Sequence, residues 1–72
     1  MPRLPACSGT EAVRAFERLG YEQARQRGSH VFLKCGGRKS LSVPLHDQLK
    51  SGTLRGLVRD SGFSVETFSD AL

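Results

Sequence analysis

The short length of the chain is the feature that most limits its fold. A folded chain of 72 residues buries roughly 60% of the surface that it exposes when unfolded, which leaves one thin core and little room for a deep cavity. Doubly wound nucleotide-binding folds and α/β barrels need much longer chains and are excluded. We therefore expect a single domain over residues 1–72, in which the proline-containing residues 1–7 form a short extended leader.

Three segments have the apolar spacing and end signals of helices. Ser8 stands three residues before Glu11, an arrangement that satisfies free backbone groups at a helix start, and Gly20 is suited to end that helix. A second helix is expected over about residues 52–61, and Ser64 is the expected cap of a short third helix. The residues at helical spacing that we expect to face the core are Val13, Phe16 and Leu19 in the first helix, Leu54, Leu57 and Val58 in the second, and Val65, Phe68 and Leu72 in the third.

The middle of the chain has the pattern of a β-sheet. Turn residues at 28–29 and 36–37 separate three expected strands, at residues 21–27, 30–34 and 39–44. Together with the helices, this order predicts an α+β fold of the form α-β-β-β-α-α, in which helices pack on one face of a three-stranded antiparallel sheet.

Side chains of the central strand alternate between the two faces of the sheet. Val31 and Leu33 point one way, and this apolar pair must lie on the face that the helices cover. His30, Phe32 and Lys34 point the other way. We therefore expect His30 on the open face, where it can meet solvent or a ligand.

The positive charge of the chain is concentrated in its middle. Eleven Lys and Arg residues against seven Asp and Glu residues give +4 overall, but residues 25–59 alone hold eight basic residues and one acidic residue, a net charge of +7. Residues 1–24 are neutral overall, and residues 60–72 carry −3. Small domains often have a solvated basic surface, yet this concentration favours a polyanionic partner such as nucleic acid.

The cysteines and histidines do not form a metal-binding motif. Cys7 and Cys35 stand alone, and His30 and His46 have neither of the spacings typical of zinc ligands. A disulfide between the two cysteines is possible in principle, but we see no signal peptide and no apolar run near the ~20 residues of a membrane span. We therefore expect a cytoplasmic protein with free thiols, no metal, no cofactor and no membrane contact.

The most specific motif begins at the first turn of the predicted sheet. Residues 25–30 read RQRGSH, and they are followed by Gly37-Arg38, by VPLH at 43–46, by GTLR at 52–55 and by GFSVETF at 62–68. This order and spacing closely resembles the HicA family of bacterial toxins, the RNA-cleaving halves of HicA–HicB toxin–antitoxin modules. The resemblance covers about residues 5–68. One departure is the first strand, which Glu22 and Gln23 make more polar than is usual for the family.

The resemblance implies a fold like the double-stranded-RNA-binding domain and an endoribonuclease that cleaves mRNA with one catalytic histidine, here His30. It also implies a HicB-type antitoxin that covers the His30 face. Histidine suits this chemistry because its side chain can take and give protons near neutral pH. RNA supplies its own nucleophile, the 2′-OH, so that we expect no metal ion to be needed.

Basic residues around His30 are the expected contacts to RNA. Arg25, Arg27 and Lys34 lie on the same or the neighbouring strand and could hold a phosphate. Lys50 and Arg55 lie near the start of the second helix, where domains of double-stranded-RNA-binding type contact phosphates. The full predicted RNA-binding set is Arg25, Arg27, Ser29, Lys34, Arg38, Lys39, Lys50 and Arg55.

Two residues have open roles in this interpretation. His46 either orients the loop before the second helix, which we favour, or acts as a second proton-transfer group. Phe32 is the sole candidate platform for stacking a base, so that we expect loose sequence selectivity.

Two other functions fit the same pattern. The first is a non-catalytic RNA-binding module of the same fold, in which His30 supplies only a contact. The second is a protein-interaction domain whose basic face meets an acidic partner. Salt-dependent binding of RNA without that partner weighs against the second function.

Overall fold

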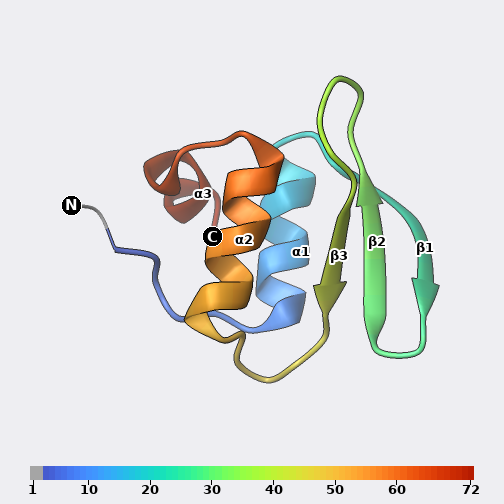
Figure 1. The fold of residues 1–72 in the computed structure, drawn as a ribbon, viewed down its shortest axis with the longest axis horizontal. Helices are drawn as coiled ribbons and strands as arrows, with labels where there is room; N and C mark the ends of the chain where they lie inside the picture. Colours follow the sequence, from blue (N-terminus) through green and yellow to red (C-terminus); the bar gives the residue numbers. More distant parts are fainter. Residues whose placement is uncertain (1–2) are drawn as a thin grey trace.

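The computed structural model of the protein describes residues 3–72. Its elements follow the predicted order (Figure 1), and they are α1 (Gly9–Arg18), β1 (Glu22–Arg27), β2 (His30–Lys34), β3 (Leu41–Pro44), α2 (Ser51–Ser61) and α3 (Val65–Ala71). The α+β fold is therefore confirmed. The first strand starts one residue later than predicted, the third strand starts two residues later, and α2 starts at Ser51.

Capping side chains start α1 and α3 where the sequence predicts them. The Ser8 hydroxyl accepts a hydrogen bond from the Glu11 backbone N–H at 3.1 Å, and the Ser8 backbone N–H donates to the Glu11 carboxylate at 2.8 Å. The Ser64 hydroxyl accepts in the same way from the Thr67 N–H at 3.0 Å. Each cap satisfies N–H groups that have no partner within the helix.

The first turn of α1 is pressed against the connection between β3 and α2. The Gly9 N–H donates to the carbonyl of His46 at 2.9 Å. A Cβ atom at position 9 would overlap the backbone carbonyl of Pro44. Only glycine fits this contact, which fixes the start of α1 beside the end of β3.

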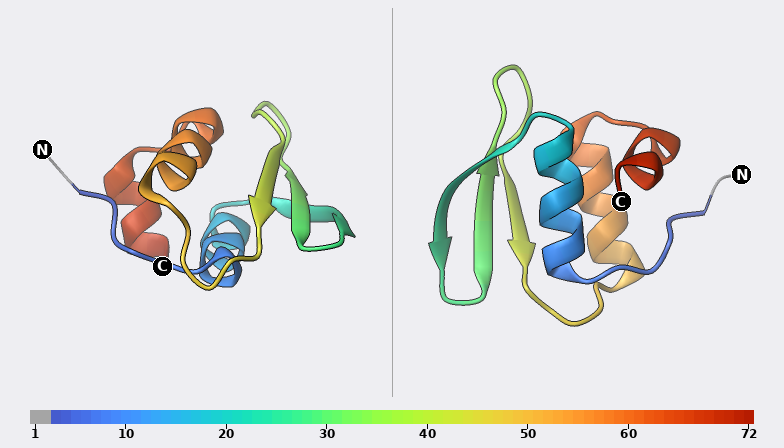
Figure 2. Two further views of the ribbon diagram at one scale, coloured as in Figure 1. Left: turned by 60° about the horizontal axis from the view of Figure 1, so that its bottom comes forward. Right: turned by 180° about the vertical axis from the view of Figure 1, so that it is seen from behind.

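The three strands form an antiparallel sheet in the order β1-β2-β3. Its covered face buries Val31, Leu33, Leu41 and Val43 against the helices, as the alternation predicts. Figures 1 and 2 show the helices gathered on the β3 side of the sheet, with β1 farthest from them. Every residue of β1 is exposed, because this strand packs along β2 and extends beyond the helices.

The core differs from the predicted one at both ends of the chain. Leu72 is 40% exposed because α3 ends at Ala71, so its predicted place in the core is wrong. Leu19 is half-buried at the C-terminal end of α1. Tyr21, expected in a polar edge strand, is only 2% exposed and donates its hydroxyl to the Lys39 carbonyl at 2.8 Å.

The predicted leader is part of the packed domain at its C-terminal end. Residues 3–7 have no regular secondary structure, as expected, and residues 1–2 of that leader lie outside the described residues. Cys7 is nevertheless buried in the core, and its carbonyl accepts a hydrogen bond from the Leu49 N–H at 2.9 Å. This contact joins the leader to the loop before α2.

Candidate nucleic-acid interface

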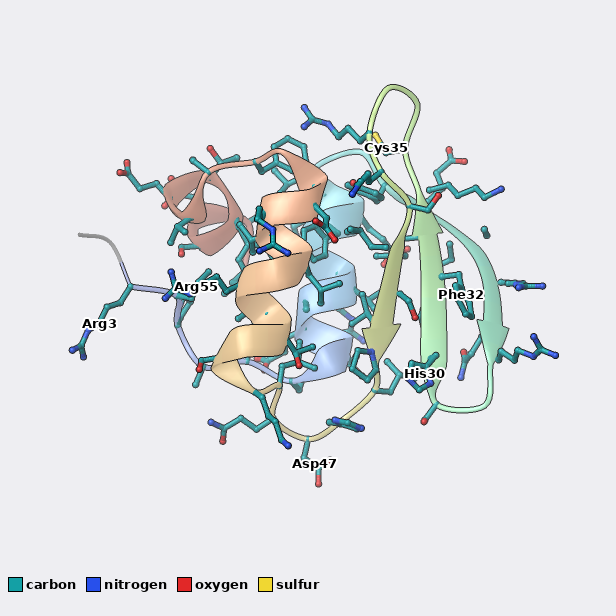
Figure 3. The ribbon with its side chains drawn as sticks, in the orientation of Figure 1. Arg3, His30, Phe32, Cys35, Asp47 and Arg55 are labelled. Atoms are coloured by element: carbon teal, nitrogen blue, oxygen red, sulfur yellow. The ribbon has the colours of Figure 1, made fainter. Side chains whose placement is uncertain are left out.

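His30 lies on the open face of the sheet, at the first position of β2 (Figure 3). The two-residue turn Gly28-Ser29 places Arg27 of β1 directly opposite His30. The pairing of β2 with β3 places Pro44 opposite His30 on the other side. Directly opposed residues of an antiparallel pair point to the same face, with Cβ atoms about 4.5–5.5 Å apart. The exposed imidazole therefore has an arginine on one side and a proline on the other.

The register also brings the next basic residues onto the His30 face. Arg25 lies opposite Phe32, and its guanidinium carbon is 5.0 Å from the centre of the Phe32 ring. A bulge between Gln23 and Arg25 then places Glu22 opposite Lys34. Taken together, the open face is lined by Arg25, Arg27, His30, Phe32, Lys34 and Ser42, with Glu22 as its acidic member.

Two contacts that the sequence did not predict hold the turn beside His30. The Ser29 carbonyl accepts a hydrogen bond from the Leu45 N–H at 2.6 Å. The Gln26 side-chain amide donates to the Gly28 carbonyl at 3.1 Å. Gly28 has φ +57°, a conformation that favours glycine at the first position of a tight hairpin turn. The backbone of the GSH segment is thus fixed by neighbours on both sides.

His46 and Lys50 lie at the same end of the molecule as His30. The β3–α2 connection lies at the lower end of the molecule in Figure 3, the end at which β2 begins. Helices α1 and α2 also begin at that end. The His46 carbonyl binds the Gly9 N–H, while its side chain is exposed. Lys50 is the N-cap residue of α2 and makes no side-chain capping bond. The role of the His46 imidazole remains a prediction, because the observed bond uses only its backbone.

Other predicted contacts lie away from this end. Lys34 is four residues from His30, about 13 Å along the strand, and Lys39 lies in the loop beyond it. Arg38 is exposed but already has partners within the protein, because its guanidinium donates to the Ser61 carbonyl at 2.7 Å and lies 3.8 Å from the centre of the Phe63 ring. Figure 3 shows Arg55 on the side of α2 that faces away from the sheet.

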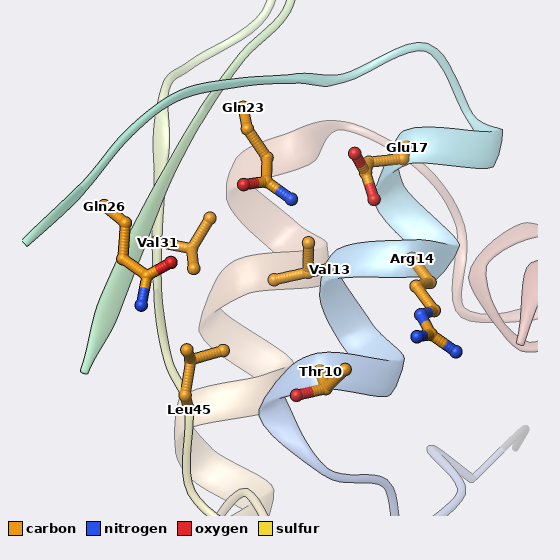
Figure 4. A pocket seen from close by; sticks show the side chains of 8 residues that line it. All are labelled: Thr10, Val13, Arg14, Glu17, Gln23, Gln26, Val31 and Leu45. Carbon is orange, nitrogen blue, oxygen red and sulfur yellow. The ribbon is translucent and has the colours of Figure 1, made fainter.

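A groove between α1 and β1 lies on the opposite face of the sheet (Figure 4). It has a volume of about 240 Å³ and is lined by Thr10, Val13, Arg14, Glu17, Gln23, Gln26, Val31 and Leu45. None of the predicted site residues is among them. The groove is formed where β1 extends beyond the helices, and it is separate from the His30 face.

The cysteines and carboxylates provide no metal centre in the described chain. Among residues 3–72, no three His, Cys, Asp or Glu side chains gather where they could hold a metal ion. Cys7 and Cys35 are both free thiols. Burial, followed by the nearby Glu11 carboxylate, raises the pKa of the Cys7 thiol, which keeps it neutral in the core. No helix within residues 3–72 has the length and apolar character needed to cross a membrane.

The order of motifs and the geometry around His30 agree with a match to a known family. A family described as "HicA toxin of bacterial toxin-antitoxin" matches residues 9–63. The chain belongs to the HicA toxin family. A search of curated proteins found no match.

The HicA match contains every predicted site residue. It begins at Gly9, the residue that α1 needs for its contact with the β3–α2 connection, and ends at Phe63, beneath Arg38. The three strands and α2 lie wholly inside it. The family assignment therefore covers the whole open face, and it identifies the chain as a toxin of the toxin–antitoxin type.

Proposed function

We propose that this HicA-family toxin is a metal-independent endoribonuclease that cleaves mRNA in the cytoplasm with His30, and that a HicB-type antitoxin neutralises it. The observation that carries the proposal is the placement of His30. Its imidazole is exposed on an open sheet face, opposite Arg27 and at a turn fixed by two backbone contacts.

The reaction uses groups that the RNA and this face supply. The 2′-OH of one nucleotide attacks the adjacent phosphorus, the bond to the 5′-oxygen breaks, and the products are a 2′,3′-cyclic phosphate and a 5′-OH. His30 either takes the proton from the 2′-OH or gives a proton to the leaving oxygen. One positioned proton-transfer group contributes about 10²–10⁴-fold. Arg27, directly opposite His30, stabilises the added negative charge of the phosphorane.

Binding of the RNA backbone falls mainly to the residues that share the His30 face. Arg25, Arg27 and Lys34 line this face, and Ser29 lies in the turn beside His30. Lys50 can extend the contact at the same end of the molecule. Lys39, Arg38 and Arg55 complete the proposed set from other parts of the surface, with Arg38 already bound within the protein.

The same open face is the proposed surface for the antitoxin. It is exposed, and three of the residues that line it are basic, against the single acidic residue Glu22. A protein partner with acidic groups can cover His30 and its arginine neighbours together, since matched charges speed encounter and fix orientation.

A non-catalytic RNA-binding module is the second candidate function. Among residues 3–72, no hydrogen bond orients the His30 side chain. A histidine that only contacts RNA needs no such orienting partner, whereas a proton-transfer group usually has its geometry set by its neighbours.

A cleavage assay separates the two functions. The purified chain is mixed with end-labelled single-stranded RNA in parallel reactions with and without EDTA, and the 3′ ends of the products are analysed. We expect cleavage with cyclic phosphate ends. Bound but intact RNA would support the binding module, and cleavage that stops in EDTA would contradict metal independence. His46→Ala, measured alongside, tests whether the second histidine takes part.

A further inference from the structure

The open face holds an aromatic ring beside an arginine near His30, and the proposed function uses Arg25 only as a contact to the RNA backbone and does not use the ring. Phe32 is half-buried, and the Arg25 guanidinium carbon lies 5.0 Å from its ring centre. The pair borders a hollow lined by Ala24, Arg25, Phe32, Leu33, Lys34 and Ser40. We infer that this hollow is a nucleobase-binding subsite, in which one base of a single-stranded RNA stacks on Phe32 under Arg25. This inference rests on the proposed RNA substrate.

The spacing from His30 suits a neighbouring nucleotide. His30 and Phe32 are two residues apart on β2 and point to the same face, so that their Cα atoms lie about 6.6 Å apart. This is comparable to the spacing of nucleotides in an extended single strand. Figure 3 shows Phe32 farther along β2 than His30. A base on Phe32 therefore positions the neighbouring phosphate at His30.

The second arginine–aromatic pair of the structure shows why the Phe32 pair can open. Arg38 lies 3.8 Å from the centre of the Phe63 ring and also donates to the Ser61 carbonyl. Arg25 is farther from its ring, and its side chain makes no hydrogen bond or ion pair within residues 3–72. Its side chain is thus free to rise and close over an inserted base. Aromatic rings and arginine planes are the usual stacking partners of unpaired bases.

The charges around the hollow also favour a nucleotide. Lys34 lies on the rim, where its ammonium group can meet the phosphate of the stacked nucleotide. Glu22, opposite Lys34, is the acidic residue on this face and offsets only part of the positive charge. Because every base has an aromatic face, we expect the subsite to bind any of the four bases with little discrimination among them.

The absence of tryptophan from the sequence allows a direct test. Phe32→Trp, placed in a His30→Ala background so that RNA stays intact, puts a single fluorophore in the subsite. We expect its fluorescence to be quenched by a short single-stranded RNA. An oligomer of abasic ribose phosphates of the same length should not quench it. Leu72→Trp in the same background, at the exposed end of the chain after α3, is the control and should respond to neither.

A second measurement does not depend on the fluorophore. Phe32→Leu keeps apolar bulk but removes the aromatic face. It should weaken RNA binding by about 5- to 150-fold, the range that corresponds to the loss of one stacked base, and leave binding of the abasic oligomer unchanged. Equal weakening for both ligands, or RNA binding without quenching, would overturn the subsite.

The two proposals fail in different ways. If the fluorescence at position 32 is quenched only by RNA that carries bases, and the wild-type chain does not cleave RNA, the subsite is supported and the nuclease is rejected. Cleavage that depends on His30, without quenching at position 32, would keep the nuclease and reject the subsite.

Discussion

At the scale of single residues, the position of His30 follows from a two-residue turn. Gly28-Ser29 sets Arg27 opposite His30, and the period of the strands then carries Arg25 and Phe32 to the same face. A turn longer by one residue would send one strand's side chains to the opposite face. The site therefore depends on backbone geometry as much as on the side chains that line it.

Replacing Gly9 by alanine adds a single methyl group, and we expect this small change to lower the stability of the fold. Gly9→Ala places a Cβ atom against the Pro44 carbonyl, so the start of α1 must move. We expect a loss of about 1–3 kcal/mol, the usual cost of overpacking. Gly56→Ala in α2 is the matched control, because its Cβ would have room, and it should gain about 0.5–1 kcal/mol. Urea unfolding measures both, and equal midpoints would contradict the packing described for position 9.

Arg38 should act on stability more than on RNA binding. Arg38→Lys keeps the charge but loses the planar stack on Phe63 and the short bond to the Ser61 carbonyl. We expect the free energy of unfolding to fall by about 1–2 kcal/mol. RNA affinity, measured by filter binding, should stay close to that of the wild type. Unchanged stability with weakened RNA binding would instead show that this side chain works on the RNA.

At the scale of elements, the capping box of α1 makes a pH-dependent contribution to stability. The bonds from the Ser8 backbone and side chain lower the pKa of the Glu11 carboxyl from its ordinary 4.5. A carboxyl whose pKa is lower in the folded state stabilises the fold above its ordinary pKa and loses that effect as the pH falls. The ionised Glu11 should thus support α1 at neutral pH and not in acid.

Glu11→Gln tests this dependence, because glutamine can keep the bond geometry without the charge. We expect the wild type to unfold at higher urea than the variant at neutral pH. The difference should shrink as the pH falls below 4.5, where Glu11 takes up a proton. A difference that stays constant across this range would show that the charge of Glu11 contributes nothing.

The elements could be predicted from the sequence because their signals are local. The Ser8 cap, the turn glycines and the alternation around Val31 and Leu33 all depend on near neighbours in the chain. Burial of Tyr21 could not be predicted this way, since its hydroxyl partner, the Lys39 carbonyl, lies 18 residues away in the chain.

The candidate site could also be predicted where it depends on local signals, but not where it depends on contacts between distant residues. The face shared by His30, Phe32 and Lys34 follows from strand period alone. The bond of Arg38 to Ser61 does not, because it joins the β2–β3 loop to the end of α2. Charge alone could not separate a basic residue that faces solvent from one that already has protein partners.

At the scale of the whole molecule, the basic residues fall into separate surfaces. Arg25, Arg27 and Lys34 share the open face, whereas Arg55 and Arg59 lie on α2. In the proposed complex, an RNA strand that lies along the sheet meets the first group, and it reaches Arg55 only if it continues onto α2. Total charge therefore overstates the number of phosphates that an RNA confined to the sheet would contact.

The salt dependence of RNA binding measures that number. For single strands, the slope of log affinity against log salt is about −0.7 per phosphate contact. Arg27→Ala should weaken binding and reduce the slope by about 0.7. Arg59→Ala, which removes an exposed charge beside Asp60 on α2, should leave the slope unchanged. If the two variants change it equally, the RNA does not lie on the sheet face.

The proposed nuclease activity depends on His30, and the rate at which a His30 variant cleaves RNA tests that dependence most directly. Single-turnover cleavage of one labelled RNA is compared between the wild type and His30→Ala, after urea unfolding shows that both are equally stable. His30 is exposed and at a strand start, so its loss should leave the fold intact. We predict a rate constant lower by about 10²–10⁴-fold in the variant. Equal rates in the two proteins would contradict the catalytic role of His30.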